Sequence, residues 1–99
     1  MRFRLEGEEI RSLYATGVSS RLPREVADAI FGTLEAVEAA PGLADLRALL
    51  SLRFRNRPEN RFEFGLPAGF KLAGRRAVER GSLVLIIDEI RRDREGRAG

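Results

Sequence analysis

The chain has 99 residues, of which 43% are hydrophobic and 33% charged, a composition typical of one folded domain rather than a disordered chain. The longest apolar run covers residues 83–87, far short of the roughly 20 residues that cross a bilayer. Cysteine and histidine are absent, which excludes disulfides, thiolate zinc sites and catalysis by Cys or His. No export signal is readable, so we expect a cytoplasmic protein with no membrane contact, no cofactor and no metal.

Charge is divided unevenly along the sequence. Residues 1–50 carry six arginines and eight carboxylates, a net charge of −2, whereas residues 51–99 carry twelve basic residues and seven carboxylates, a net charge of +5. Every basic residue except Lys71 is arginine, which a GC-rich genome would also produce. A basic surface concentrates a phosphate polyanion near it, so we expect an anionic partner, with nucleic acid favoured.

A short strand and a helix are predicted first. Residues 1–5 alternate between apolar and basic, as in a half-buried strand. The helix is expected to begin at Glu8 and Glu9, because carboxylates in a first turn complement the helix dipole, and to end at Gly17. Its core-facing stripe is expected to contain Ile10, Leu13 and Tyr14.

The clearest helical pattern runs from Glu25 to Ala39. Pro23 is expected at the first helical position, where its missing N–H costs nothing, and Pro41 with the following glycine ends the helix. The apolar residues that recur with helical spacing, and should face the core, are Val26, Ile30, Phe31, Leu34 and Val37. Residues 43–50 are expected to add a short helical turn.

From residue 51 the hydrophobic period changes to two, which predicts strands joined by short turns. The expected strands cover residues 52–57, 61–66, 70–73 and 83–90, and turn residues occupy 58–60, 67–69 and 81–82. The last strand is nearly continuously apolar, so it should lie inside the sheet and be covered on both faces. The domain is expected to span residues 1–90, followed by a charged tail at 91–99.

This order, β-α-α-β-β-β-β, predicts an α+β fold. Two N-terminal helices should pack on one face of a mostly antiparallel sheet of four or five strands, and leave the other face open. The basic side chains expected on the open face are Arg53, Arg55, Arg57, Arg61 and Lys71. Nucleic-acid binding depends on these groups gathering into one cationic hollow. The alternative is a solvated strand face that merely deters edge pairing.

Several short segments resemble a known family when taken in order over about residues 10–90. They are Leu13-Tyr14-Ala15-Thr16-Gly17, Leu22-Pro23, Ala39-Ala40-Pro41-Gly42-Leu43-Ala44-Asp45-Leu46, Phe62-Glu63-Phe64 and Gly69-Phe70-Lys71-Leu72. The family is that of RelE/HigB toxins, in particular its HigB-like plasmid maintenance killer branch. The resemblance implies a RelE-like fold and a ribosome-dependent endoribonuclease, or mRNA interferase, that cuts mRNA in the decoding site. It also implies inhibition by a neighbouring helix-turn-helix antitoxin.

The sequence departs from this branch at two histidine positions. A histidine usual on the first core strand is replaced by Arg55, and the Tyr-His pair that usually ends the last strand is missing. Two alignments of that last strand are open: one places Asp93 and Arg94 at the terminal pair, the other Glu89 and Ile90. The first continues the strand and keeps the hydrophobic spacing.

RNA cleavage at a 2′-hydroxyl needs a base, stabilisation of charge on the phosphate and a proton for the leaving oxygen. We expect the catalytic residues to be Arg55, Lys71 and Arg94. The base is left open between Lys71, Glu63 and Asp93. Residues expected to contact RNA are Arg53, Arg57, Arg61, Arg75 and Arg76, the last two in a loop or turn after Gly74. The alternative function is a catalytically inactive RelE-fold module that binds RNA or an antitoxin.

Overall fold

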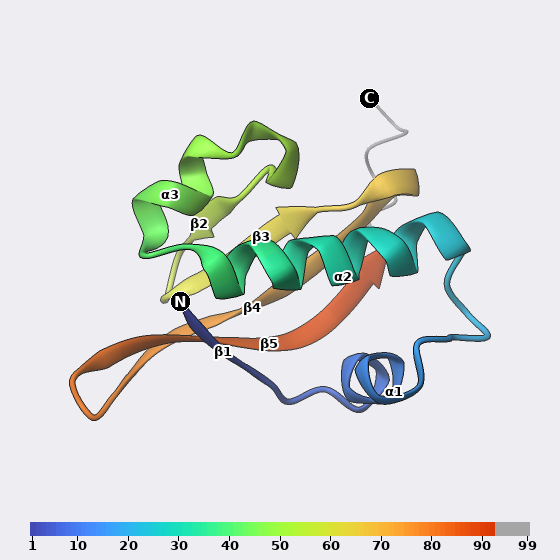
Figure 1. Cartoon of the computed structure of the whole chain (residues 1–99), viewed down its shortest axis with the longest axis horizontal. Helices are drawn as coiled ribbons and strands as arrows, with labels where there is room; N and C mark the ends of the chain where they lie inside the picture. Colours follow the sequence, from blue (N-terminus) through green and yellow to red (C-terminus); the bar gives the residue numbers. More distant parts are fainter. Residues whose placement is uncertain (93–99) are drawn as a thin grey trace.

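The computed structural model describes residues 1–92 as a layer of helices on a sheet (Figure 1). The elements are β1 (Arg2–Leu5), α1 (Glu8–Thr16), α2 (Arg24–Ala39), α3 (Leu43–Ala48), the 3-10 turn η1 (Leu50–Leu52), β2 (Arg55–Arg57), β3 (Arg61–Gly65), the 3-10 turn η2 (Pro67–Gly69), β4 (Phe70–Glu79) and β5 (Ser82–Arg92). No helix within this part of the chain has the length and apolar character that a bilayer span requires.

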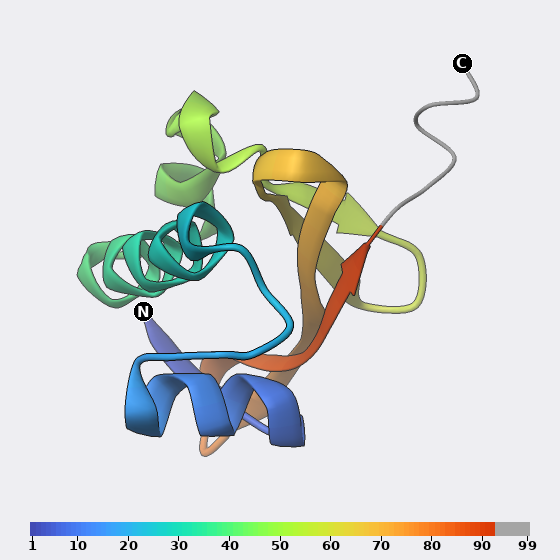
Figure 2. The ribbon, with the colours of Figure 1, turned by 90° about the vertical axis from the view of Figure 1, so that its right-hand side faces the viewer.

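The five strands form one mixed sheet in the order β1-β5-β4-β3-β2. β1 runs parallel to β5, and the other neighbouring pairs are antiparallel. α1 and α2 lie on the same side of the sheet, so one face is covered and the other is open (Figure 2). The prediction of an α+β fold with helices on one face is confirmed at this level.

α1 begins and ends where the sequence predicts. Glu8 and Glu9 lie in its first turn, and Gly17 follows it in the left-handed conformation, with its N–H bonded to the Leu13 carbonyl oxygen at 2.7 Å. The expected core stripe is correct for Ile10 and Leu13, which are buried. It is wrong for Tyr14, which is 50% exposed. This residue lies at the rim of the core, where its ring stacks on Phe31.

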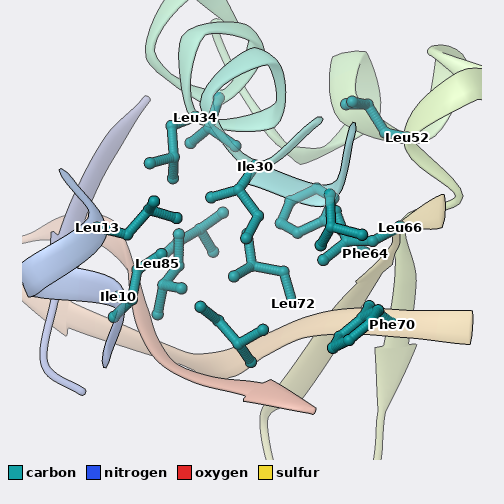
Figure 3. Packing of buried hydrophobic residues seen from close by; sticks show 14 of the residues in the cluster. Ile10, Leu13, Ile30, Leu34, Leu52, Phe64, Leu66, Phe70, Leu72 and Leu85 are labelled. Carbon is teal, nitrogen blue, oxygen red and sulfur yellow. The ribbon is translucent and has the colours of Figure 1, made fainter. Parts of the chain in front are cut away.

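α2 buries the predicted stripe, except that Phe31 is only half-buried. Its first helical residue is Arg24, so the expectation for Pro23 is wrong by one position. Pro23 has an extended ψ of 151°. It is therefore the N-cap residue, directly before the first helical residue. The stripe packs on the inward side chains of β3, β4 and β5, as Figure 3 shows for Ile30, Leu72 and Leu85 among others.

β5 is buried on both faces, as its apolar run predicted. Val84, Leu85, Ile86 and Ile87 are all buried. Leu85 and Ile87 belong to the core cluster under the helices, whereas Val84 and Ile86 lie outside that cluster. Because side chains alternate along a strand, Val84 and Ile86 face the open side.

The first expected strand of the second half is largely wrong. Only Arg55–Arg57 pairs with β3, while Leu52 ends the turn η1 and Arg53 adopts a left-handed conformation with φ 50°. Leu52 and Phe54 both contact the core, but Leu52 lies in η1 and Phe54 in the irregular segment before β2, not in a strand. A Cβ on Gly65 would lie 2.7 Å from Arg53 Cδ, so the glycine leaves room for the arginine stem.

β4 and β5 are longer than predicted. Arg75 and Arg76 lie inside β4, so the prediction that they form a loop or turn is wrong. An irregularity between Ala73 and Gly74 shifts the pairing with β5, and a Cβ on Gly74 would overlap the Ile86 carbonyl oxygen. β5 continues to Arg92, so the expected tail does not begin at 91. Asp93 and Arg94 lie outside the described residues.

Candidate nucleic-acid interface

The open face of the sheet combines cations and carboxylates. Alternation puts the inward side chains of β3 under the helices and turns Arg61 and Glu63 outward. The register then places Arg55 and Arg57 of β2 on the same face as these two residues. Strands β4 and β5 add Lys71, Arg75 and Arg91, which also contact carboxylates there.

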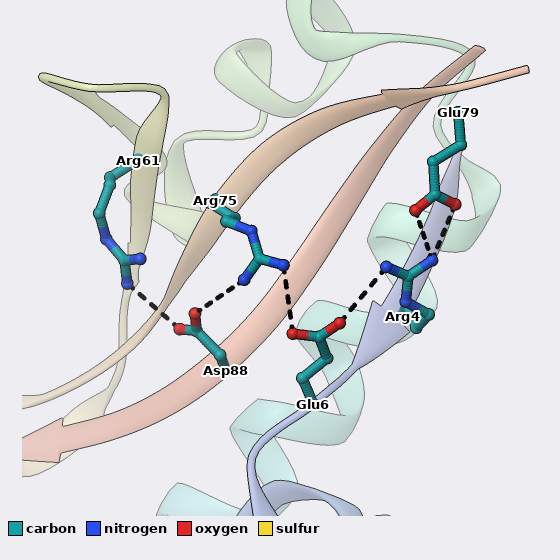
Figure 4. A network of polar contacts seen from close by, with 6 residues as sticks. All are labelled: Arg4, Glu6, Arg61, Arg75, Glu79 and Asp88. Atoms are coloured by element: carbon teal, nitrogen blue, oxygen red, sulfur yellow. Dashed lines mark hydrogen bonds and ion pairs between the residues drawn. The ribbon is translucent and has the colours of Figure 1, made fainter. Parts of the chain in front are cut away.

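A line of alternating charge crosses this face from β3 to β1 (Figure 4). Arg61 contacts Asp88 at 3.2 Å, and Asp88 contacts Arg75 at 3.6 Å. Arg75 reaches Glu6 at 3.3 Å, and Glu6 contacts Arg4 at the same distance. Arg4 ends the line on Glu79 at 2.6 Å. Each cation in this line is therefore matched by a carboxylate from another strand or from Glu6, which follows β1.

Glu63 lies on β3, two residues after Arg61, and its side chain is only 8% exposed. Arg91 Nη2 approaches one carboxylate oxygen at 3.0 Å, and Lys71 Nζ approaches the other at 3.8 Å. Arg55 is the cross-strand partner of Glu63 in the β2–β3 register. Glu63 is thus a nearly buried anion bordered by three cations from three strands.

The charged side chains also cover an apolar floor. Ala73, Val84 and Ile86 are buried, although no helix within residues 1–92 packs on this side. Long arginine side chains cover apolar surface with their aliphatic stems while the charged ends stay in water. The network of the open face therefore has a structural role beside any binding role.

The edge strand β2 differs from the centre. Arg55 and Arg57 are exposed, as is Arg53 just before the strand. Within residues 1–92 none of these three guanidinium groups has an ion pair with a carboxylate. We call Arg53, Arg55 and Arg57 the β2 arginines. They are the part of the predicted cationic surface that remains available to a ligand.

Arg76 lies apart from the other predicted RNA contacts. It pairs with Leu85, which faces the helices, so Arg76 projects from the opposite side of the sheet from Arg75. Its Nη1 donates to the Asn56 side-chain oxygen at 2.7 Å, while its Nε is buried and has no hydrogen-bond partner among the described residues. A shared contact of Arg75 and Arg76 with one phosphate is therefore not supported.

Two arginines have raised pKa values. Hydrogen bonds to the Glu79 carboxylate raise the pKa of Arg4, and those to the Glu9 carboxylate raise the pKa of Arg21. Arg21 holds Glu9 with two bonds of 2.6 and 2.8 Å, and its guanidinium lies 5.8 Å from the centre of the Phe70 ring. Both groups stay charged at any working pH, so they can bind anions but not transfer protons.

The predicted site is thus only partly assembled. The open face brings together Arg55, Arg57, Arg61, Lys71 and Arg75, but the expected cationic hollow is wrong at its centre, where internal carboxylates neutralise the cations. Sequence reasoning named Glu63 as a candidate base, but it missed Arg91, which it assigned to the tail, and the ion pairs that Asp88, Glu89 and Glu6 make with the arginines. The acidic residues of β5, Asp88 and Glu89, were the available signal.

The structure defines an α+β domain with an open sheet face of alternating charge and an arginine-rich edge. No model of a protein family matches the chain, and no curated protein matches it. Among residues 1–92, no group of three or more carboxylates is placed to hold a metal ion. The resemblance to the RelE/HigB toxins therefore stays a prediction from the sequence.

Proposed function

We propose that the chain is a toxin of the RelE/HigB type that binds mRNA on the ribosome, cleaves it and is neutralised by a helix-turn-helix antitoxin. The family-like segments support the class, and the α+β architecture is compatible with it. One observation carries the proposal: Arg55, which has no carboxylate partner within residues 1–92, is the cross-strand neighbour of the nearly buried Glu63, which Lys71 and Arg91 border.

The β2 arginines supply the electrostatic part of RNA binding. Guanidinium groups present a fixed fork of donors to phosphate oxygens and are only weakly hydrated. Arg55 and Arg57 are two residues apart on one strand, so their side chains leave the same face about 6.7 Å apart. An RNA strand that follows this edge would pass beside Glu63.

The groups around Glu63 match the needs of RNA cleavage. The Glu63 carboxylate accepts the 2′-hydroxyl proton, the 2′-oxygen forms a bond to phosphorus, and the bond from phosphorus to the 5′-oxygen breaks. Arg55 and Arg91 stabilise the added negative charge on the phosphate, and Lys71 gives a proton to the leaving oxygen. RNA phosphate must first replace Glu63 as the partner of Arg91. Arg94 lies outside the described residues, and its expected catalytic role stays a prediction.

A second function, RNA binding without cleavage, is favoured by the ion pairs of Glu63. The Glu63 carboxylate is nearly buried and is held by Arg91 and Lys71, so it is not free to approach a 2′-hydroxyl. The chain also has no histidine to take over this role. Binding through the β2 arginines would then be the whole activity.

Purified protein added to translating ribosomes, followed by mapping of mRNA 5′ ends, separates the two functions. Cleavage predicts new ends with the unchanged protein and none with Glu63→Gln, while Glu63→Gln still binds RNA. Arg55→Ala with Arg57→Ala should lower both binding and cleavage. Asp28→Asn, on the exposed side of α2, is the matched control and should change neither.

Three outcomes are decisive. RNA binding without new ends supports the second function and overturns the proposed cleavage. New ends that persist in folded Glu63→Gln overturn the role of Glu63 as base. Absence of both binding and new ends overturns the proposed function, provided that circular dichroism shows a folded protein.

A further inference from the structure

A cavity on the helix side of the molecule is bordered by aromatic rings and carboxylates. It has a volume of about 250 Å³ and lies between β1, α1 and α2. The residues that line it are Phe3, Tyr14, Phe31, Leu34, Glu35 and Glu38. Phe3 pairs with Leu85, which faces the helices, so this cavity opens on the side opposite the charge network of the sheet.

The aromatic wall is already formed. The Tyr14 ring stacks on Phe31 with centroids 5.9 Å apart and an interplanar angle of 20°. Phe3 meets Tyr14 edge-on at 6.4 Å and 84°. Tyr14 nevertheless remains half exposed. Since two neighbours fix this ring, a ligand that stacks on it would not have to order it first.

Within residues 1–92, no cation is ion-paired with the carboxylates of the cavity. Glu35 and Glu38 are three residues apart on α2 and therefore lie on one side of the helix. In the part of the chain that the structure describes, neither side chain makes an ion pair or a hydrogen bond. The N-terminal ammonium is nearby, but it donates to the backbone oxygens of Glu38 and Ala40.

We propose that this cavity binds an arginine side chain of a partner protein. A cation is attracted to the face of an aromatic ring, and a guanidinium plane also stacks on it. The fork of N–H donors would then reach Glu35 and Glu38 as charge-assisted bonds. The volume lies below the roughly 300–1,000 Å³ of typical small-molecule pockets, which favours a single side chain.

The cavity lies in the first half of the chain, and the net charge of that half also favours a basic partner. Residues 1–50 carry a net charge of −2, in contrast to the positive second half. The cavity and the β2 arginines lie on different elements, so one protein molecule could hold a basic partner and RNA together. The proposal does not depend on the proposed function and fails or holds separately from it.

Chemical-shift titration of the ¹⁵N-labelled protein with capped peptides tests the proposal. The probe is a Gly/Ser peptide with a single central arginine, and the comparison peptides carry lysine or neutral citrulline at that position. We expect shifts centred on Phe3, Tyr14, Phe31 and Glu35 with arginine, weaker ones with lysine and none with citrulline. Equal response to citrulline overturns the proposal, because a cation would then not be recognised.

Variants locate the site. Tyr14→Ala, and Glu35→Gln with Glu38→Gln, should each weaken arginine binding by about fivefold or more, whereas Tyr14→Phe should retain it. Glu25→Gln with Asp28→Asn removes two exposed carboxylates from the other end of α2 and should have no effect. Shifts confined to the carboxylates of the open sheet face would overturn the proposal. Shifts at the cavity on concentrating the protein alone would assign it to a second copy of this chain and also overturn it.

Discussion

The centre and the edge of the open sheet face are both rich in arginine, yet they differ in what surrounds each guanidinium. In the centre, Arg61 and Arg75 share Asp88, and their ends are held between strands. At the edge, Arg55 and Arg57 have no carboxylate partner within residues 1–92 and are exposed. The same residue type is thus part of the scaffold at one place and available to a ligand at the other.

This difference shows that a count of basic residues does not give the charge of a surface. Arg61 and Arg75 are direct neighbours in the β3–β4 register, and such like-charged pairs repel unless a carboxylate lies between them. Asp88 of β5 supplies that carboxylate. Arg57 is at the outer edge, and in the part of the chain that the structure describes no further strand lies beyond it to provide one. Position in the sheet therefore decides which arginines remain free.

The largest effect on the centre of the open face is expected from a substitution at Gly74, where the β4–β5 pairing is irregular. Gly74→Ala places a Cβ against the Ile86 carbonyl oxygen, and backbone on both sides limits relaxation. We expect a loss of about 3 kcal/mol or more in the free energy of unfolding, measured by urea denaturation. Gly32→Ala, on α2 with open space around it, is the control and should stabilise by about 0.5–1 kcal/mol. Equal stability of Gly74→Ala and the unchanged protein would contradict this explanation.

Glu63→Gln tests whether the centre needs its buried anion. The amide keeps the shape but removes the negative charge of Glu63, which Arg91 and Lys71 contact. We expect the free energy of unfolding to fall by about 1–3 kcal/mol at neutral pH, because the cations lose charge-assisted bonds in a mostly buried place. Glu79→Gln, at a more exposed ion pair, should cost less. A larger loss in Glu79→Gln would reverse our ranking of the two sites.

Measurements of RNA affinity compare the edge of the open sheet face with its centre directly. Arg55→Ala with Arg57→Ala should lower the log–log slope of affinity against salt by about 1.4, since each phosphate contact on a single strand contributes about 0.7. Arg61→Ala with Arg75→Ala should change the slope much less, because Asp88 already neutralises these groups. Fluorescence anisotropy of a labelled single-stranded RNA at several KCl concentrations measures both. Equal slopes for the two double variants would remove the distinction between edge and centre.

The smallest effect is that of salt on the stability of the unchanged protein. The ion pairs of the centre are partly exposed, and added salt screens such pairs. Because exposed pairs contribute little, we expect the melting temperature to fall by less than about 5 °C between low and moderate salt. Calorimetry at a series of KCl concentrations would show it. A much larger fall would mean that the charge network, rather than the core, holds the sheet together.

Local sequence determined the elements whose signal is a regular hydrophobic pattern. The stripe of α2, the apolar run of β5 and the left-handed Gly17 all follow from neighbours in the chain. The α+β class follows from the order of these elements. In each case the physical cause, helical or strand periodicity or a glycine φ, acts within a few residues.

The tertiary structure alone decided which charges meet. Arg61 and Asp88 are 27 residues apart and come together only because β3, β4 and β5 are adjacent and Gly74 shifts the register. The turn at Arg53 likewise depends on the space above Gly65, which no local pattern reveals. These ion pairs form between strands rather than along one strand. The sequence therefore determined how many arginines the chain has, and the fold determined which of them pair with a carboxylate.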